Sequence, residues 1–320
     1  MYNDICLYQK DKMKKVFALS GGSGRIICSL PALQKYYKKH GPNFYIFSES
    51  GIEFFVGHKE LQDLAYDVQT KGIFENIIKP NELVTIEPYR DHGYYNQQRS
   101  IVEAFDFLIN ETTDHSDLER PKICLSKHEE IQAVDAIGNA KKEHRKNKTV
   151  VIQPFGRSSV TNQTEVFDPM SRSLSKADYF KIVKALRKEY NVIYFGEHAL
   201  PEDTETVKMQ GSLRQWAAVI EACDYFVGCD SVGQHMAYAF NKPGTVIMGS
   251  TFVENVSYKT HFQILNKSPL DIRYFPIRIA EGLEGELANR YNDTCMDFTD
   301  NELSSMIDKI MTDIKKKTKG

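Results

Sequence analysis

The stretch from Ala222 to Gly249 reads ACDYFVGCDSVGQHMAYAFNKPGTVIMG. Two apolar segments within it, Tyr225–Gly228 and Thr245–Met248, predict buried strands, and the residues between them predict a helix. Asp230 and Ser231 precede that helix, and both residue types are preferred at a helix N-terminus. A helix that begins at the carboxyl end of a parallel strand directs unpaired N–H groups and positive dipole density toward the crevice above the sheet. The stretch therefore predicts an α/β sheet with a phosphate site at the start of the helix.

Gly233 and His235 lie on the first turn of the predicted helix. A glycine at this place would let a ligand approach the backbone closely, because it has no Cβ. The alternative interpretation is an ordinary strand-to-helix turn in which Asp230 only caps the helix. Both interpretations fit the spacing.

The length of the chain, 320 residues, suits two α/β domains. In the first half, segments that predict strands alternate with segments that predict helices, which is typical of a parallel sheet with helices on both faces. The predicted strands are Val16–Leu19, Phe44–Phe47, Phe74–Ile78 and Leu83–Ile86, and the predicted helices are about Ile26–Lys39 and Ser100–Ile109. The polar region from Asn110 to Lys148 predicts a connection between the domains.

The second half repeats the alternation, with predicted strands at Thr149–Gln153 and Val192–Phe195. Helix starts are marked by pairs that resemble capping boxes: Ser175 with Asp178, Ser212 with Gln215, and Thr299 with Glu302. We therefore expect one Rossmann-like domain over residues 1–148 and another over 149–298. An amphipathic helix within 299–320 could pack back on the N-terminal domain. Two doubly wound domains with loops at their strand ends would face a central cleft, where open α/β sheets bind ligands.

The formal net charge of −2 excludes a globally basic nucleic-acid-binding protein. Two local basic runs, Lys141–Lys148 and Lys315–Lys319, are typical of solvated surface. The six cysteines are scattered, and we identify neither a secretory signal nor a transmembrane segment, so we expect a cytoplasmic protein, or one of the host cytoplasm if it is viral. No Asp-x-Asp pair or His/Asp/Glu cluster has metal-ligand spacing, so we expect no metal and no required cofactor.

Further candidate phosphate ligands follow other predicted strands. The loop SGGSGR, Ser20–Arg25, contains Gly22 and Gly24, and it is neither a dinucleotide fingerprint nor a Walker loop. Arg157 and Arg172 follow the strand that ends at Gln153, and Arg side chains are suited to clamping phosphate. Each of these features also has an alternative interpretation without a ligand: the glycine loop as a tight turn, and each Arg as a surface residue.

Glu197 follows the strand that ends at Phe195. A carboxylate at the end of a strand commonly accepts hydrogen bonds from a ribose diol. The alternative is a solvated loop glutamate.

The second half resembles glycosyltransferase family nine, the group of ADP-heptose:lipopolysaccharide heptosyltransferases with the GT-B fold. The resemblance covers most of the chain and is weaker in the first half. Its elements, in order, are SGRIICSLPALQKYYKK, IQPFGRSS, SRSLSKADYFKIVKAL, YFGE, SLRQWAAVIEACDYFVGCDSVGQHMAYAFNKPGTVIMG and STF. The Asp-Ser-x-Gly-x-His block at 230–235 is the most specific of them.

The resemblance implies a donor site for a nucleotide diphosphate sugar. It places Asp230, Ser231, Gly233 and His235 around the donor pyrophosphate and sugar. Arg172 falls where the family has a phosphate-binding Lys, and Glu197 matches its ribose-binding carboxylate.

One departure from the family pattern concerns the catalytic base. Family members usually have Gly-Asp after the first strand, whereas this chain has Gly24–Arg25, and an Arg cannot accept a proton at neutral pH. Asp91 is the first alternative for the base, with His92 and Glu87 behind it. These residues could equally be loop residues that only shape the acceptor site.

The sequence therefore predicts a metal-independent, inverting glycosyltransferase that uses an ADP-, UDP- or GDP-linked sugar and a saccharide acceptor. A second interpretation is a phage-type DNA glycosyltransferase that modifies a hydroxymethylated base such as 5-hydroxymethylcytosine. Arg25, the aromatic loop at 89–95 and the basic runs are compatible with it. A third interpretation is a nucleotide-sugar binding protein without catalysis. Oligomeric state is not readable from the sequence.

Overall fold

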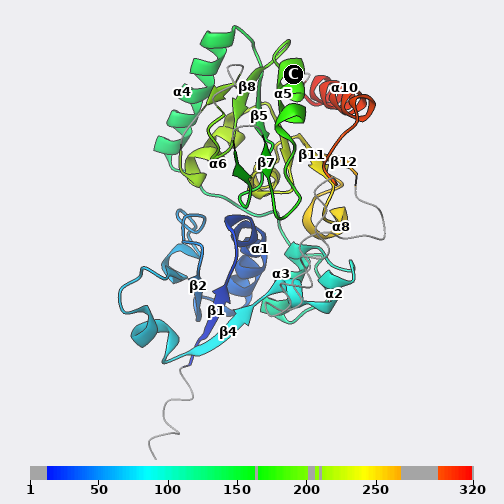
Figure 1. Cartoon of the computed structure of the whole chain (residues 1–320). Helices are drawn as coiled ribbons and strands as arrows, with labels where there is room; N and C mark the ends of the chain where they lie inside the picture. Colours follow the sequence, from blue (N-terminus) through cyan, green and yellow to red (C-terminus); the bar gives the residue numbers. More distant parts are fainter. Residues whose placement is uncertain (1–12, 163–164, 201–205, 209–210, 268–294, 319–320) are drawn as a thin grey trace, which may run out of the picture. The chain divides into compact units, whose positions relative to one another are not determined.

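The computed structural model describes residues 13–162, 165–200, 206–208, 211–267 and 295–318. These residues form two compact units, which Figure 1 shows in ribbon form. The first unit contains the chain up to Asp91 together with Ile101–Cys124. The second unit contains His92–Ser100 together with the chain from Leu125 onward. Each unit is described by itself below.

The first unit is built on a four-stranded parallel sheet with the strand order β3-β2-β1-β4. Its strands are β1 (Lys15–Leu19), β2 (Phe44–Ser48), β3 (Ala65–Asp67) and β4 (Glu82–Ile86). Its helices are α1 (Ser23–His40) and α3 (Ile101–Asn110), with short helical turns at Gln62–Leu64, Phe74–Ile78 and Pro88–Arg90. Helix α1 packs on α3, so segments some 70 residues apart in sequence share one core.

The second unit is built on a six-stranded parallel sheet with the order β12-β11-β10-β5-β8-β9. Its strands are β5 (Thr149–Gln153), β8 (Asn191–Tyr194), β9 (Val207–Lys208), β10 (Tyr225–Cys229), β11 (Gly244–Met248) and β12 (Gln263–Asn266). A separate antiparallel hairpin joins β6 (Val160–Thr161) to β7 (Val166–Phe167). The helices are α2 (His92–Tyr95), α4 (Lys127–His144), α5 (Lys176–Leu186), α6 (Leu213–Ala222), α7 (Val232–Ala239), α8 (Val253–Val256) and α10 (Asp300–Lys317).

Helices cover both faces of the six-stranded sheet. Alternate strand residues such as Val150 and Ile152 share a core cluster with residues of α5 and α10. Because side chains alternate along a strand, the residues between them point to the other face, where α4, α6 and α7 pack. Every residue of β5, β8, β10 and β11 is buried, as expected of central parallel strands. The predicted α/β class with Rossmann-like, doubly wound organisation is confirmed.

Most predicted elements are present, and two segments differ from the prediction. The predicted strand Phe74–Ile78 is wrong, because this segment is a π-helical turn. The region Asn110–Lys148, predicted to be a connection, contains the long helix α4, which packs on α6 of the second unit. Helix α4 has a full capping box between Ser126 and Glu129.

Helix α10 buries its apolar stripe in the second unit, and the stripe consists of Leu303, Met306, Ile310 and Ile314. These side chains share the core cluster with strand residues of the six-stranded sheet. The sequence allowed this helix to pack back on the N-terminal domain, but its apolar face packs in the core of the second unit.

A short segment from the first half of the sequence belongs to the second unit. Residues His92–Ser100 are held there by Asn255 at the end of α8, whose Nδ2 donates to the Tyr94 carbonyl at 2.6 Å and to the Arg99 carbonyl at 3.2 Å. Tyr94 is only 2% exposed. The chain thus passes between the units three times, at residues 91–92, 100–101 and 124–125.

Candidate functional site

The start of α7 follows the carboxyl end of β10, as the sequence predicts. Ser231 is its N-cap residue, but the Ser231 side chain makes no capping hydrogen bond to the helix. A side chain from the neighbouring strand takes that role: Gln153, at the end of β5, accepts from the Gly233 N–H at 2.8 Å. The amide of Gln153 donates to the Ser231 hydroxyl at 3.2 Å. One helix N–H is therefore satisfied by the protein itself.

Gly233 has a different role from the one predicted for it. A Cβ at this position would lie 2.4 Å from Gln153 Oε1 and 2.8 Å from the tip of the Phe226 ring. The space beside the glycine is therefore filled by the protein's own side chains. The correction is that Gly233 permits Gln153 to cap the helix, and no room for a ligand follows from its lack of a side chain.

Asp230 lies at the same corner and is 5% exposed. Its Oδ1 accepts from Gln234 at 2.6 Å and its Oδ2 accepts from Thr251 at 3.0 Å. Burial raises the pKa of Asp230, and the positive charge of Arg172 opposes that rise. The carboxyl is thus fixed in orientation by α7 and by the loop after β11.

Arg172 reaches this corner from the loop between β7 and α5. A Cβ placed on Gly156 would lie 3.6 Å from Arg172 Nη2 and 3.3 Å from Asp168 Oδ2, so the two charged groups share the space beside that glycine. Asp168 organises the loop: its Oδ2 accepts from the backbone of Arg172 at 3.1 Å and from the Ser173 hydroxyl at 2.7 Å. Burial alone would raise the pKa of Asp168, but the hydrogen bond from Ser173 and the charge of Arg172 outweigh it and lower the pKa.

The loop also contains a residue in a left-handed conformation. Ser171, directly before Arg172, has φ of 52° and is 6% exposed. A non-glycine residue adopts this backbone region only when the surroundings hold it there. Here the Ser171 amide donates to the Asp168 carbonyl at 2.8 Å, and its carbonyl accepts from the Cys295 thiol at 3.3 Å.

His235 is buried on the first turns of α7, with Nδ1 2.9 Å from the Tyr258 hydroxyl. Burial, assisted by the charge of Arg172, lowers the pKa of His235 to about 3. The imidazole is therefore neutral at pH 7 and adds no positive charge to the site. It can hydrogen-bond a ligand but cannot pair with a phosphate as an ion.

The remaining second-unit candidates lie at the surface. Arg157 and Glu197 are both exposed. In the same two loops, Ser159 Oγ lies 2.7 Å from His198 Nε2, a pair that the sequence did not suggest. Ser250, after β11, is 1% exposed, and its hydroxyl has no hydrogen-bond partner among the described residues. One corner of the second unit thus brings together five of the predicted site residues: Asp230, Ser231, Gly233, His235 and Arg172. The other two, Arg157 and Glu197, are exposed in loops that follow strands at the same edge of the sheet.

In the first unit, Arg25 and Glu87 form a two-pronged ion pair. Arg25 Nη2 lies 3.0 Å from Glu87 Oε1, and Nη1 lies 3.2 Å from Oε2. The Arg25 guanidinium also lies 4.7 Å from the centre of the Tyr89 ring. Gly22 is the N-cap residue of α1 and Gly24 lies in its first turn. Arg25 is thus a fixed partner of Glu87, so Glu87 is a poor candidate for a free base.

The other two base candidates fall in different units. Asp91 is the last residue of its segment in the first unit and is 5% exposed, whereas His92 opens the segment of the second unit and is exposed. Sequence proximity alone grouped them.

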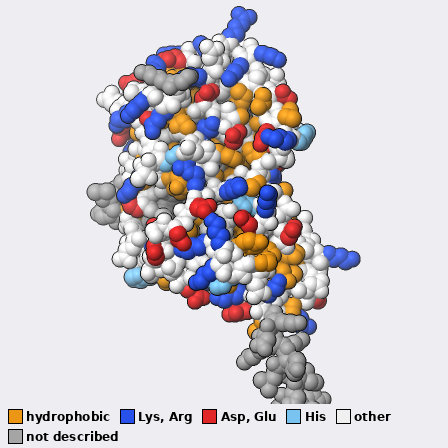
Figure 2. Space-filling view, turned by 180° about the vertical axis from the view of Figure 1, so that it is seen from behind, with side chains coloured by type: hydrophobic (Ala, Val, Ile, Leu, Met, Phe, Trp, Pro, Cys, Tyr) orange, Lys and Arg blue, Asp and Glu red, His pale blue; other side chains and the backbone are white. Residues whose placement is uncertain are grey.

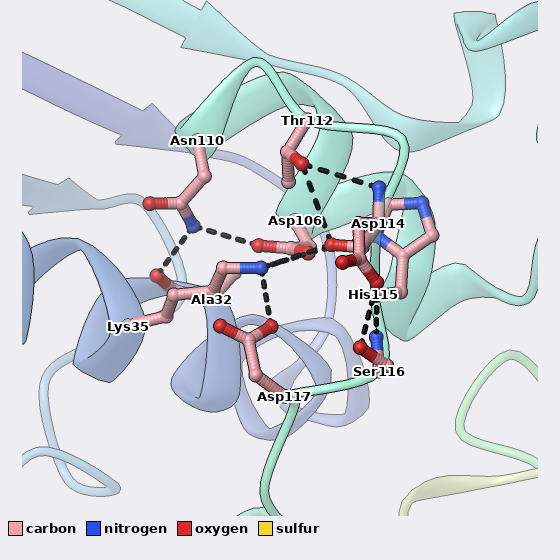
Figure 3. Close-up of polar contacts among 9 residues, drawn as sticks. All are labelled: Ala32, Lys35, Asp106, Asn110, Thr112, Asp114, His115, Ser116 and Asp117. Atoms are coloured by element: carbon pink, nitrogen blue, oxygen red, sulfur yellow. Dashed lines mark hydrogen bonds and ion pairs between the residues drawn. The ribbon is translucent and has the colours of Figure 1, made fainter.

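A second buried polar cluster lies in the first unit and is drawn in Figure 3. Asp106 on α3 is fully buried, and its Oδ2 lies 3.1 Å from Lys35 Nζ and 2.7 Å from His115 Nδ1. Asn110 donates to its Oδ1 at 2.8 Å. Lys35 Nζ also lies 2.5 Å from Asp117 Oδ1, so the cluster connects α1, α3 and the 112–117 loop. The signal in the sequence is a lone Asp on the buried stripe of a helix, which favours a structural ion pair.

Two findings concern other classes of site. Across the part of the chain that the structure describes, no three His, Cys, Asp or Glu side chains are grouped so as to hold a metal ion. No helix within those residues has the length and apolar character needed to cross a bilayer.

Sequence comparison alone finds no relatives: no family profile matches the chain, and no curated protein matches it. Solved structures do match. A glycosyl transferase family 9 protein from Veillonella parvula has a TM-score of 0.62 at 9% identity, over 94% of this chain and 98% of that one. ADP-heptose lps heptosyltransferase II from E. coli has a TM-score of 0.58 at 13% identity, over 95% and 99%. E. coli heptosyltransferase WaaC with ADP has a TM-score of 0.52 at 12% identity, over 94% and 99%.

These three structures match this chain over nearly its whole length and theirs. At 9–13% identity the likeness concerns the fold. Together with the two parallel α/β units, it confirms the predicted GT-B architecture. The chain has the fold of the family-nine glycosyltransferases.

Proposed function

We propose that the chain is a glycosyltransferase whose second unit binds a nucleotide diphosphate sugar at the start of α7. The observation that carries the proposal is the corner at which Arg172 and the buried Asp230 lie beside the amino end of α7. A guanidinium next to a helix N-terminus is suited to a diphosphate, because both favour negative charge. The fold likeness to WaaC with ADP, and to TibC in complex with ADP-D-beta-D-heptose (TM-score 0.55, 10% identity, 95% of this chain and 77% of that one), supports the choice of ligand.

The proposed reaction is an inverting transfer that requires no metal. The acceptor hydroxyl oxygen forms a bond to the anomeric carbon while the bond from that carbon to the diphosphate breaks. The electron pair goes to the diphosphate, whose growing charge Arg172 and the positive end of the α7 dipole stabilise. The acceptor proton goes to a base, for which Asp91 is our first choice and His92 our second. Glu87 is the weakest, because both of its oxygens are engaged by Arg25.

The donor site is tested with nucleotide diphosphates alone. ADP, UDP and GDP are added separately, and the midpoint of thermal unfolding is recorded, since a ligand that binds only the folded state raises it. We expect one of the three to raise the midpoint of the wild type, and Arg172→Ala to weaken that ligand by about 10- to 100-fold, the effect of losing a charged hydrogen bond of about 1.5–3 kcal/mol.

Lys181→Ala is the matched control, because it removes an exposed cation from the middle of α5 whose partner is Asp300 of α10. It should leave nucleotide binding unchanged. Equal binding by wild type and Arg172→Ala would remove the donor site from this corner.

The acceptor is proposed to be a saccharide, in line with the lipopolysaccharide heptosyltransferases among the similar folds. Incubation of the protein and donor sugar with a saccharide acceptor, with DNA containing 5-hydroxymethylcytosine, or with neither separates the three alternatives. Transfer to the sugar supports the proposal, and transfer to the DNA supports the DNA glycosyltransferase. Donor binding with no transfer or hydrolysis supports a binding protein.

A further inference from the structure

Three basic segments that are remote in sequence meet at one end of the second unit. They are Lys141–Lys148 at the end of α4, Lys184–Glu189 at the end of α5, and Asp313–Thr318 at the end of α10. We call them together the basic end. Figure 2 shows several Lys and Arg side chains at the upper end of the view, interspersed with Asp and Glu, where Figure 1 places α10 and the C-terminus.

Hydrogen bonds hold the three segments together. Lys146 Nζ donates to the Lys188 carbonyl at 2.8 Å, and Lys148 Nζ donates to the Thr318 hydroxyl at 3.0 Å and also to the Thr318 carbonyl. Lys315 Nζ lies 2.9 Å from Glu189 Oε1. The cations are thus brought together by the fold and not only by their spacing along the chain.

The basic end carries a large excess of positive charge. It contains eleven Lys and Arg residues and three Asp and Glu residues. The cations are Lys141, Lys142, Arg145, Lys146, Lys148, Lys184, Arg187, Lys188, Lys315, Lys316 and Lys317. Of the acids, Glu189 is paired with Lys315, and Asp313 accepts from the Tyr225 hydroxyl at 2.5 Å. Since the whole chain has a net charge of −2, positive charge is concentrated here and the rest of the chain is acidic.

The basic end lies away from the corner that holds Arg172 and Asp230. Lys148 directly precedes β5, whereas Gln153 ends it beside α7; likewise Glu189 lies just before β8 and Glu197 just after it. The strands are parallel, so all their amino ends lie on one edge of the sheet and all their carboxyl ends on the other. The basic end is therefore a surface separate from the donor site, about 15 Å away along a strand of five residues.

The partner must be a polyanion, and the side chains distinguish its class. Attachment to an anionic bilayer through basic residues takes a second, apolar signal to be stable. Within the described residues, none of the exposed large hydrophobic side chains lies in the three segments. Helix α10 cannot supply one, because its apolar stripe is buried in the core. Contacts to nucleic-acid phosphates need no apolar anchor, since release of counterions drives them.

The residue types further favour a duplex over a single strand. The basic end is mostly Lys, which acts as a flexible point charge, and the three segments contain no Phe, Tyr or Trp on which unpaired bases could stack. We propose that the basic end of the second unit is a binding surface for the phosphate backbone of double-stranded DNA, without preference for sequence. This surface is a docking site, because a duplex held there contacts the opposite edge of the sheet from the donor corner.

The proposal is tested with the full chain and a fluorescently labelled duplex of 30 base pairs without modified bases. Anisotropy is recorded between about 50 and 200 mM salt, the range over which binding to phosphates weakens steeply. The variant Lys142→Glu/Lys316→Glu/Lys317→Glu changes three exposed cations of the basic end. We expect its affinity to fall at least tenfold. The slope of log K against log salt should become shallower by about 3, since each cation that binds a phosphate adds close to 0.9 to it.

The matched control is Lys59→Glu/Lys71→Glu/Lys79→Glu, which makes the same change in net charge at exposed residues of the first unit. It should bind DNA within about twofold of the wild type. A second variant, Lys142→Gln/Lys316→Gln/Lys317→Gln, removes the same three charges without reversing them. It should give an intermediate loss of affinity, which distinguishes lost DNA contacts from misfolding caused by charge reversal.

Three outcomes would overturn the proposal: no DNA binding by the wild type at 50 mM salt, an equal loss of affinity in the control, or binding to phosphatidylglycerol vesicles without binding to DNA. Thermal stabilisation by nucleotide diphosphates is measured on the same variants. Because the two surfaces are separate, that stabilisation should be unchanged in all of them. The failure of one proposal is thereby distinguished from the failure of the other.

Discussion

Single residues at the start of α7 have roles that depend on partners far away in sequence. The Asp-Ser-x-Gly-x-His block predicts a strand end followed by a helix start, and this is confirmed. The role of Gly233 could not be predicted, because the side chain that fills the space beside it comes from Gln153, 80 residues earlier. The neutral state of His235 was equally hidden, since it results from burial and from the charge of Arg172. Local pattern thus gives the position of a site residue, while its chemistry depends on tertiary neighbours.

His235 should make the stability of the protein depend on pH in the acid range. Its pKa is about 3 in the folded protein and near 6.5 when unfolded, so between these values the unfolded state binds more protons. Stability due to this residue is complete above pH 6.5 and is lost as the pH falls toward 3. Between pH 7 and pH 4.5 the loss should be about 2.5 kcal/mol. His235→Gln cannot titrate and should lack this part of the loss.

The measurement is urea unfolding of wild type and His235→Gln at both pH values. His58 has a pKa that burial also lowers, so both proteins should lose some stability in acid. Only the difference between them reports on His235. Parallel losses in the two proteins would contradict a buried, neutral imidazole.

At the scale of elements, capping signals predicted helix starts well, and apolar runs predicted strands less well. The boxes Ser212 with Gln215 and Thr299 with Glu302 open α6 and α10 as expected. The box at Ser126 and Glu129 is of the same kind, but α4 went unpredicted because its surroundings are rich in charge. The run at 74–78 is apolar and short, and periodicity alone cannot distinguish a strand from a helical turn over five residues.

The pairing of α4 with α6 rests in part on the ion pair between Glu129 and Arg214. Glu129 Oε1 lies 2.5 Å from Arg214 Nε, and both side chains are mostly buried, at 15% and 12% exposed. The hydrogen bond from Arg214, with those from Ser126, lowers the pKa of Glu129 to about 2. Glu129→Gln keeps an amide that can complete the capping box but removes the charge. We expect it to lower the free energy of unfolding by about 1–3 kcal/mol, as an Arg left without its partner is costly.

Glu130→Gln is the matched control on the same turn. Glu130 pairs with Lys127 at 2.6 Å, but the Lys127 side chain is 89% exposed, so its loss should cost less than about 0.5 kcal/mol. Denaturant unfolding measures both variants. Equal effects would mean that the Glu129–Arg214 pair adds nothing to the packing of the two helices.

At the scale of the whole molecule, the units are not the halves of the sequence. The alternation of strands and helices is enough to predict two parallel α/β units, because each βαβ connection is local. The placement of residues 92–100 in the second unit depends instead on contacts between residues far apart in sequence. These are the hydrogen bond from Asn255 of α8 and the burial of Tyr94, which a local sequence pattern does not encode. This is why the base candidates Asp91 and His92, adjacent in sequence, belong to different units.

The placement of residues 92–100 in the second unit can be tested by calorimetry. Each unit has its own core, so we expect two unfolding transitions, of which the nucleotide diphosphate raises only the one of the second unit. Tyr94→Ala should lower that same ligand-sensitive transition, although residue 94 lies in the first third of the sequence. Phe105→Ala, which removes a side chain 1% exposed on α3, should lower the other one. Each large-to-small change should cost about 3–5 kcal/mol. Tyr94→Ala could instead lower the transition whose midpoint the nucleotide does not change. In that case residues 92–100 would be stabilised by the first unit, and the base candidates Asp91 and His92 would belong to the same unit.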